Sequence, residues 1–151
     1  IIGGGEAMLV DTLSDLPKTR RMLRALEPIL ESHNAEITVL VNTHHSFDHC
    51  WGNQLVVHQF PNVRTLASRR ALEEMRRDVK PIQFLDVLDK ARSGKLGRRR
   101  GSFGDFLTGR FAHLSDLDKI TVTLPKETFE GKLDVAVGGR IVELVECGPA
   151  H

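Results

Sequence analysis

The feature that most constrains the fold of this chain is a short apolar run that leads directly into a group of histidines. The run is residues 37–41, Ile-Thr-Val-Leu-Val, and residues 43–49 read Thr-His-His-Ser-Phe-Asp-His. An unbroken run of this kind is typical of a buried strand. The histidines therefore belong to the carboxyl end of a strand, which is where open α/β sheets usually place ligands.

The segment before this run predicts a strand–helix–strand unit. Residues 7–11 form a short apolar stretch, and Pro17 begins a helical pattern that Asn34 is suited to end. Apolar residues recur in that helix near a 3.6-residue period: Leu16, Leu23, Leu26, Ile29 and Leu30. The unit has the length that a right-handed crossover between parallel strands requires, so the chain belongs to the α/β class.

The segment after the histidines predicts a further strand, several helices and a hairpin. Residues 63–67 read as a strand, and Ser68 is a good N-cap for a helix over residues 69–79. Residues 81–117 have a helical pattern broken by glycines, which we interpret as an insertion of broken helices that lies over or beside the site and could form a lid. Residues 133–137 and 140–145 alternate around Gly138-Gly139, which predicts a β-hairpin with a primed turn.

Composition indicates one soluble globular domain over residues 1–151. Hydrophobic residues make up 40% and charged residues 27% of the 151 positions, and the net charge is +1. A charge so close to zero argues against a nucleic-acid track, and no apolar stretch approaches the roughly 20 residues of a membrane-spanning helix. Only Cys50 and Cys147 are present, too few for a disulfide framework, so we expect a cytoplasmic protein.

The histidine cluster itself predicts a metal site. His44, His45 and His49 fall within six positions, with Asp48 between the second and the third. Imidazole nitrogen and carboxylate oxygen are the ligands that zinc accepts in proteins. The two residues after the cluster are interpreted differently, Cys50 as a small buried residue and Trp51 as a packing residue.

Three sequence blocks together resemble the metallo-β-lactamase superfamily. They are Leu-Val-Asp-Thr at 9–12, Thr-His-x-x-x-Asp-His-x-x-Gly-Asn at 43–53 and Gly-Pro-Ala-His at 148–151. The resemblance implies an αββα sandwich, of which this chain would hold mainly the N-terminal half together with the helical insertion at 81–117. It also implies that the chain is truncated at both ends and that further metal ligands follow residue 151.

The same resemblance assigns roles to the cluster. By position, His44 and His151 would bind a first metal ion, and Asp48 and His49 a second. Asp48 would also be the catalytic residue that orients a water molecule or carries its proton. Asp11 would support the metal loop, because a carboxylate that orients a ligand imidazole is a common partner of metal-bound histidine. We therefore expect the imidazoles of His44 and His151 to lie close together.

Ser46 departs from the family pattern, because it stands where a second histidine is expected. His45 does not simply replace it, since neighbouring side chains of an extended segment point to opposite sides, although an irregular loop could turn it inward. Three outcomes follow: a first metal with fewer protein ligands, a single metal at the second site, or loss of the metal. We favour a weakened or mononuclear zinc site.

The resemblance favours a zinc-dependent hydrolase of a small ester, thioester or lactone that uses a metal-activated water. The Asp-His-Cys-Trp-Gly-Asn sequence at 48–53 resembles small-molecule hydrolases of the family and its polyketide cyclase/thioesterase branch, which implies a small-molecule or carrier-bound acyl substrate. A non-catalytic, metal-depleted protein and a nuclease of the same fold are the alternatives. The protein could also form a homodimer.

Overall fold

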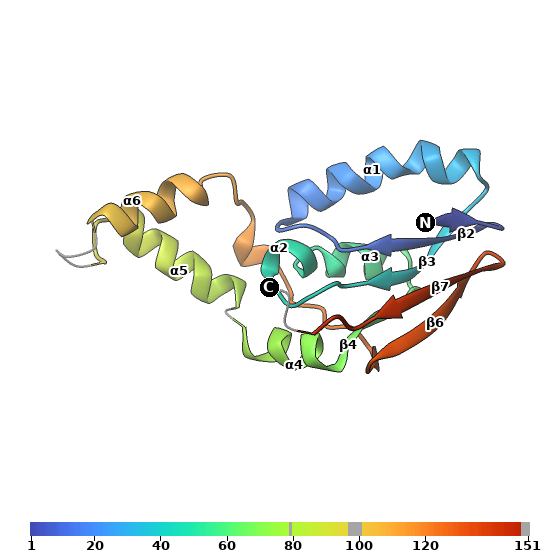
Figure 1. The fold of residues 1–151 in the computed structure, drawn as a ribbon. Helices are drawn as coiled ribbons and strands as arrows, with labels where there is room; N and C mark the ends of the chain where they lie inside the picture. Colours follow the sequence, from blue (N-terminus) through green and yellow to red (C-terminus); the bar gives the residue numbers. More distant parts are fainter. Residues whose placement is uncertain (79, 97–100, 149–151) are drawn as a thin grey trace.

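The computed structural model describes residues 1–78, 80–96 and 101–148, which form a layered α/β fold around a five-stranded sheet (Figure 1). The strands follow the order β1-β2-β3-β4-β5. Their bounds are Ile2–Gly3, Glu6–Val10, Glu36–Val41, Arg64–Ser68 and Glu127–Phe129. β1 is antiparallel to β2, and the other neighbours are parallel. Val10 is in register with Val41, so β2 and β3 end at the same edge.

The predicted strand–helix–strand unit is confirmed as β2, α1 and β3. Helix α1 spans Leu16–Ser32, and the Asp15 carboxylate caps it by accepting a hydrogen bond from the Lys18 amide at 2.8 Å. Asn34, just beyond the helix, has a positive φ of 45°, which fits its predicted role as the stop. Leu23 and Leu30 of α1 pack on β3, together with Val56 of helix α3, Asn53–Gln59.

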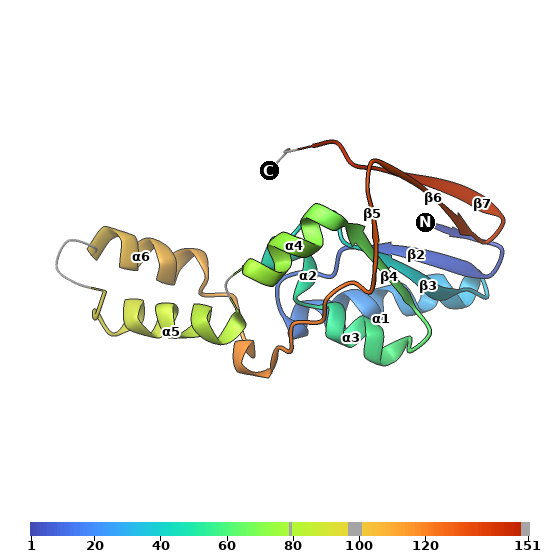
Figure 2. The same ribbon diagram turned by 90° about the horizontal axis from the view of Figure 1, so that it is seen from below.

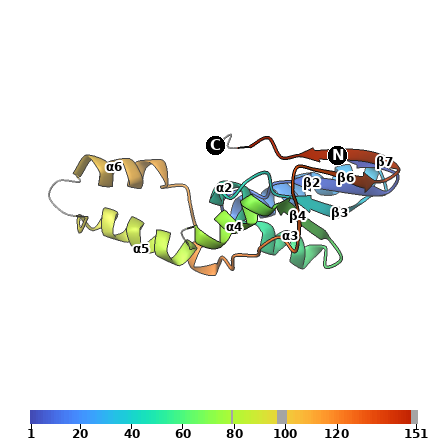
Figure 3. The same ribbon diagram turned by 60° about the horizontal axis from the view of Figure 1, so that its bottom comes forward.

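The predicted hairpin is confirmed as β6, Lys132–Val137, and β7, Arg140–Val145. Gly138 and Gly139 have φ values of 54° and 79°, as a two-residue primed turn requires. Val135 and Val137 are buried against Met8, Val39 and Leu66 of the main sheet. The hairpin thus covers the sheet face opposite α1 and α3, and the described chain forms helix, sheet and hairpin layers (Figures 2 and 3).

The helices that follow β4 extend beyond the edge of the sheet at which β2 and β3 end (Figure 1). Helix α4, Arg69–Arg77, begins at Ser68, whose hydroxyl accepts a hydrogen bond from the Ala71 amide as predicted. Helices α5, Pro81–Arg92, and α6, Gly101–Arg110, run side by side and project from the sheet, and the short helix η1, Leu117–Lys119, follows (Figure 2). No helix in the described ranges is long and apolar enough to cross a membrane.

Candidate metal centre

Asp11 is the anchor of the candidate site. It follows β2 with a left-handed φ of 61°, a conformation that Asp tolerates better than most residues. Its Oδ1 accepts a hydrogen bond from the Thr43 amide at 2.8 Å, and its Oδ2 accepts one from the Thr43 hydroxyl at 2.7 Å. The same Oδ2 lies 2.8 Å from Nδ1 of His49. Because a carboxylate only accepts, His49 donates from Nδ1, and its neutral tautomer leaves the Nε2 lone pair available.

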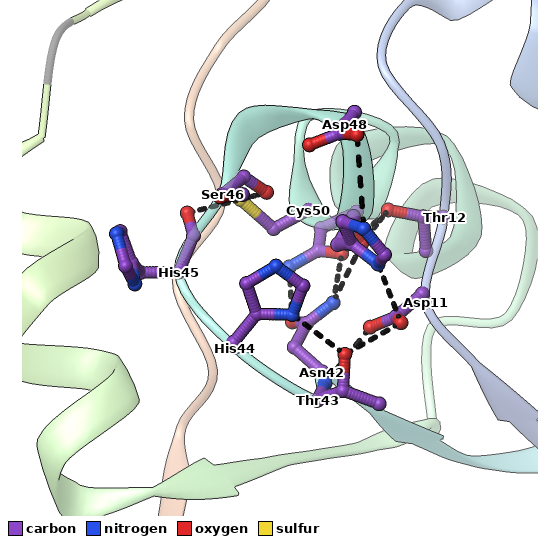
Figure 4. Close-up of polar contacts among 11 residues, drawn as sticks. Asp11, Thr12, Asn42, Thr43, His44, His45, Ser46, Asp48 and Cys50 are labelled. Atoms are coloured by element: carbon purple, nitrogen blue, oxygen red, sulfur yellow. Dashed lines mark hydrogen bonds and ion pairs between the residues drawn. The ribbon is translucent and has the colours of Figure 1, made fainter. Parts of the chain in front are cut away.

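Three of the predicted donors lie on one side of the loop. The His44 and His49 rings have centroids 4.1 Å apart, and Nε2 of His49 lies 3.7 Å from Oδ2 of Asp48. His49 and Asp48 share the short helix α2, Phe47–Cys50, whereas His44 lies in the loop that precedes it. The loop therefore places the His49 ring beside that of His44 and beside the exposed Asp48 carboxylate, whereas His44 and Asp48 lie apart from each other (Figure 4).

His45 and Ser46 lie outside this group. The His45 ring points away from Asp11 and His44 (Figure 4), and its centroid is 6.0 Å from that of His44 at an interplanar angle of 86°. Ser46 occupies the N-cap position of α2, yet its hydroxyl makes no capping bond to the helix. Its carbonyl instead accepts the His49 amide at 3.0 Å.

The donor set fits zinc in its chemistry and is incomplete within the part of the chain that the structure describes. An imidazole oriented by a carboxylate and an adjacent carboxylate are groups that zinc accepts. Across residues 1–78, 80–96 and 101–148, however, no three side chains of His, Cys, Asp or Glu are disposed to hold a metal ion. His151 lies outside these residues, so its predicted approach to His44 stays a prediction.

Cys50 takes no part in the donor group. Its thiol is buried under the loop, and its single S–H is shared between the carbonyls of His45 at 3.4 Å and Ser46 at 3.5 Å. Burial, assisted by the negative charges of Asp78, Asp11 and Asp48, raises the pKa of the Cys50 thiol to about 12. The predicted role as a small buried residue is confirmed. Trp51, buried against Phe47 with ring centroids 4.8 Å apart, is likewise a packing residue.

A groove of about 610 Å³ opens beside His44, between the end of the main sheet and the end of β7. Its walls are Val10, Val41, Asn42, Thr43, His44, His45, Ser68, Arg70, Ala71, Glu74, Phe129 and residues 143–148. The groove thus joins the carboxyl ends of β3 and β7 at one edge. None of its walls comes from the described part of residues 81–117, so helices α5 and α6 as described do not line the groove.

Sequence reasoning missed the polar side chains that surround the loop. Asn42 and Thr12 are buried next to it, and Thr43 contacts Asp11 directly. Their signal in the sequence was polar residues directly after two buried strands, where a side chain is kept only if its hydrogen bonds are satisfied.

Comparisons with known proteins bear on the family and the fold of the chain. A family model described as the metallo-beta-lactamase superfamily matches residues 1–151. Among solved structures, a double mutant of the sec-alkyl sulfatase PisA1 is 16% identical, with a TM-score of 0.57 over 95% of this chain and 23% of its own. That match shows a shared fold.

Two metallo-beta-lactamase structures are also similar over about half of the chain. The mono-zinc form of FIM-1 from Pseudomonas aeruginosa is 23% identical over 51% of this chain and 32% of its own, with a TM-score of 0.41. The enzyme from Hirschia baltica is 23% identical over 50% and 32%, with a TM-score of 0.40. The chain therefore spans about a third or less of the length of each of these three structures.

Proposed function

The chain belongs to the metallo-β-lactamase superfamily, and on that premise we propose that the intact protein is a zinc-dependent hydrolase of a small ester, thioester or lactone. The observation that carries the proposal is the Asp11–His49 hydrogen bond of 2.8 Å, which leaves Nε2 of His49 beside Asp48 and next to the His44 ring. A carboxylate that fixes an imidazole in this way is the usual support of a metal-binding histidine.

The roles of the residues follow from their exposure and contacts. By position in the family pattern, His44 and His151 would hold a first ion and Asp48 and His49 a second, and a divalent metal ion there would supply Lewis-acid activation of a water nucleophile and of a carbonyl. Asp48 is 54% exposed and contacts His49 at its edge, so it is free to accept a proton from an attacking water or to orient that water. We propose one tightly held ion, because Ser46 provides no imidazole at the position where the family has one.

The groove beside His44 favours an uncharged acyl group as the bound part of the substrate. Its apolar walls include Val10, Val41 and Leu144. Three carboxylates, those of Glu74, Glu143 and Glu146, also line it and outnumber the single guanidinium group, that of Arg70. Carboxylates raise the cost of placing a phosphate or sulfate group there. An acyl ester or thioester, free or carried by a protein, is therefore the better substrate than a phosphodiester or a sulfate ester. A cytoplasmic location belongs to the same proposal, since both cysteines are free thiols.

The second candidate is a non-catalytic protein of the same fold, and Ser46 is the observation that favours it. In that case the Asp11–His49 pair would serve only to fix the loop.

The deciding experiment measures metal content and hydrolysis in the full-length protein. Elemental analysis should find about one zinc per chain, and aliphatic p-nitrophenyl esters or acyl thioesters should be cleaved faster than p-nitrophenyl sulfate or bis-p-nitrophenyl phosphate. Asp48→Asn should lower the rate at least about 100-fold, while Asp86→Asn, an exposed change on α5, should not. A metal-free protein with no activity would instead support the non-catalytic candidate.

Substitution of Ser46 tests the proposed number of ions. Ser46→His adds a nitrogen donor at the position where the family has one, so zinc occupancy should rise above that of the unsubstituted protein. Unchanged zinc affinity in isothermal titration would show that residue 46 does not face the ion.

A further inference from the structure

The main chain of His49 is held as firmly as its side chain. Its carbonyl oxygen accepts hydrogen bonds from the Thr12 amide at 2.8 Å and from Asn42 Nδ2 at 3.1 Å, and it accepts the longer branch, at 3.3 Å, of the hydrogen bond that the single Thr12 O–H shares between two acceptors. Thr12 follows β2 and Asn42 follows β3, so the ends of two neighbouring strands converge on one backbone atom. With Asp11 holding Nδ1, His49 is fixed at both its ring and its backbone.

Asn53 connects the two residues that hold this carbonyl. Its Oδ1 accepts from the Thr12 hydroxyl at 2.8 Å and from Asn42 Nδ2 at 3.1 Å. Its Nδ2 donates to Asn42 Oδ1 at 2.8 Å and to the Thr123 carbonyl at 2.9 Å. The side chain is 1% exposed, and both lone pairs and both N–H groups of the amide are used.

This arrangement is more than a local cap of α3. Asn53 is the first residue of that helix, but its amide points to the strand ends and to a segment 70 positions away. A buried amide whose four hydrogen bonds are all satisfied has one orientation, because rotating it would leave several buried polar atoms without partners. The orientation of Asn53 therefore defines where Thr12 and Asn42 direct their donors.

We infer that Asn53 is a positioning residue for the metal centre. It holds Thr12 and Asn42, which hold the His49 backbone, and thereby sets the place of the His49 and Asp48 side chains on α2. The metal-related part of this inference rests on the proposed function, whereas the positioning of the loop does not.

The neighbouring Gln54 provides a matched control. Its side chain donates to the Lys119 carbonyl at 3.3 Å and accepts a hydrogen bond from the Thr121 amide. Gln54 thus ties the first turn of α3 to the same returning segment that Thr123 belongs to, but its side-chain hydrogen bonds do not involve Thr12, Asn42 or His49. A loss of general stability should affect both residues, and a loss of positioning only Asn53.

The experiment compares Asn53→Ala, Gln54→Ala, Thr12→Val and Thr12→Ser in the full-length protein. In the metal-free state, hydrogen exchange of the amide at position 12, which donates to His49, should accelerate at least about 10-fold in Asn53→Ala and remain within about twofold in Gln54→Ala. Zinc affinity should fall about 10- to 100-fold in Asn53→Ala and Thr12→Val. Thr12→Ser, which keeps the hydroxyl, should restore affinity.

The outcomes are distinguishable. Asn53→Ala that lowers the melting temperature but leaves both zinc affinity and exchange at position 12 unchanged would overturn the inference. An unsubstituted protein that binds no zinc would refute the proposed function, and the exchange comparison would still decide the role of Asn53. If Asn53→Ala does not fold, the same two measurements on Thr12→Val against Thr12→Ser decide it, and equal behaviour of that pair would count against Asn53.

Discussion

At the residue scale, Asp11 shows how one carboxylate organises the loop. It holds both Thr43 and His49 from a left-handed backbone position. Asp11→Asn keeps a side chain that tolerates this conformation but removes the anion that His49 faces. We expect zinc affinity to fall about 10- to 100-fold by isothermal titration, with a far-UV circular dichroism spectrum like that of the unsubstituted protein.

The matched control for Asp11 is Asp89→Asn on α5. Asp89 pairs with Arg92 at 3.2 Å on the exposed surface, and such pairs contribute little to stability. Its zinc affinity should equal that of the unsubstituted protein. Equal affinities in all three proteins would remove Asp11 from the support of the site.

The two cysteines should react very differently with a thiol reagent. Cys50 is buried and the pKa of its thiol is raised to about 12, whereas Cys147 is exposed. Because the thiolate is the reacting form, Ellman's reagent at pH 8 should modify one thiol in the native chain and two after denaturation. Above pH 9 the Cys50 thiol loses its proton in the unfolded chain but keeps it in the folded chain. The free energy of unfolding should therefore fall as the pH rises from about 9 toward 12. Two fast native thiols would contradict the burial.

At the element scale, Gly52 allows α2 and α3 to meet the end of β2. A Cβ at this position would lie 2.2 Å from both the Thr12 carbonyl oxygen and Thr19 Oγ1. The Thr19 hydroxyl already donates to that carbonyl at 2.6 Å, so neither atom is free to move away. Gly52→Ala should lower the free energy of unfolding by about 2–3 kcal/mol in urea titrations.

Gly109→Ala is the control for Gly52. A Cβ at Gly109 would meet no atom within 4 Å, and the residue lies in α6. Since alanine favours a helix over glycine, this change should stabilise the protein by up to about 1 kcal/mol. A Gly52→Ala protein as stable as the Gly109→Ala protein would show that the close approach is not needed.

At the scale of the whole molecule, an aromatic cluster joins the projecting helices to the donor loop. The Phe84 ring of α5 has its centroid 5.5 Å from that of Phe47, 6.0 Å from Trp51 and 5.0 Å from Phe111. Phe47 is the first residue of α2 and directly precedes Asp48. The projecting helices therefore pack against α2 through Phe47. Phe84→Ala should cost about 2–3 kcal/mol and speed hydrogen exchange in α2 and α5, because it opens a cavity between them.

Phe103→Ala on α6 is the corresponding control, since that side chain is exposed and stacks only on Phe106 among the described rings. It should change stability by no more than about 0.5 kcal/mol. If Phe84→Ala accelerated exchange in α5 alone, the projecting helices would be independent of the loop.

The sequence by itself determined the elements and the chemistry of the loop. The strand–helix–strand unit, the Ser68 cap and the Gly138–Gly139 turn were predictable because each depends on a local pattern of a few residues. The grouping of His44, Asp48 and His49 was predictable for the same reason, since six positions of one loop contain them. The layered fold rested on a resemblance that the family match supports.

Only the tertiary structure decided how the loop is held. The contacts of Thr12, Asn42, Asn53 and Thr123 join positions up to 70 residues apart, and no local periodicity encodes such pairs. The same is true of Phe84 beneath Phe47 and of the groove between β3 and β7. Local propensity and hydrophobic pattern act along the chain, whereas the orientation of a ligand side chain depends on which buried donors, acceptors and rings the packed layers bring to it.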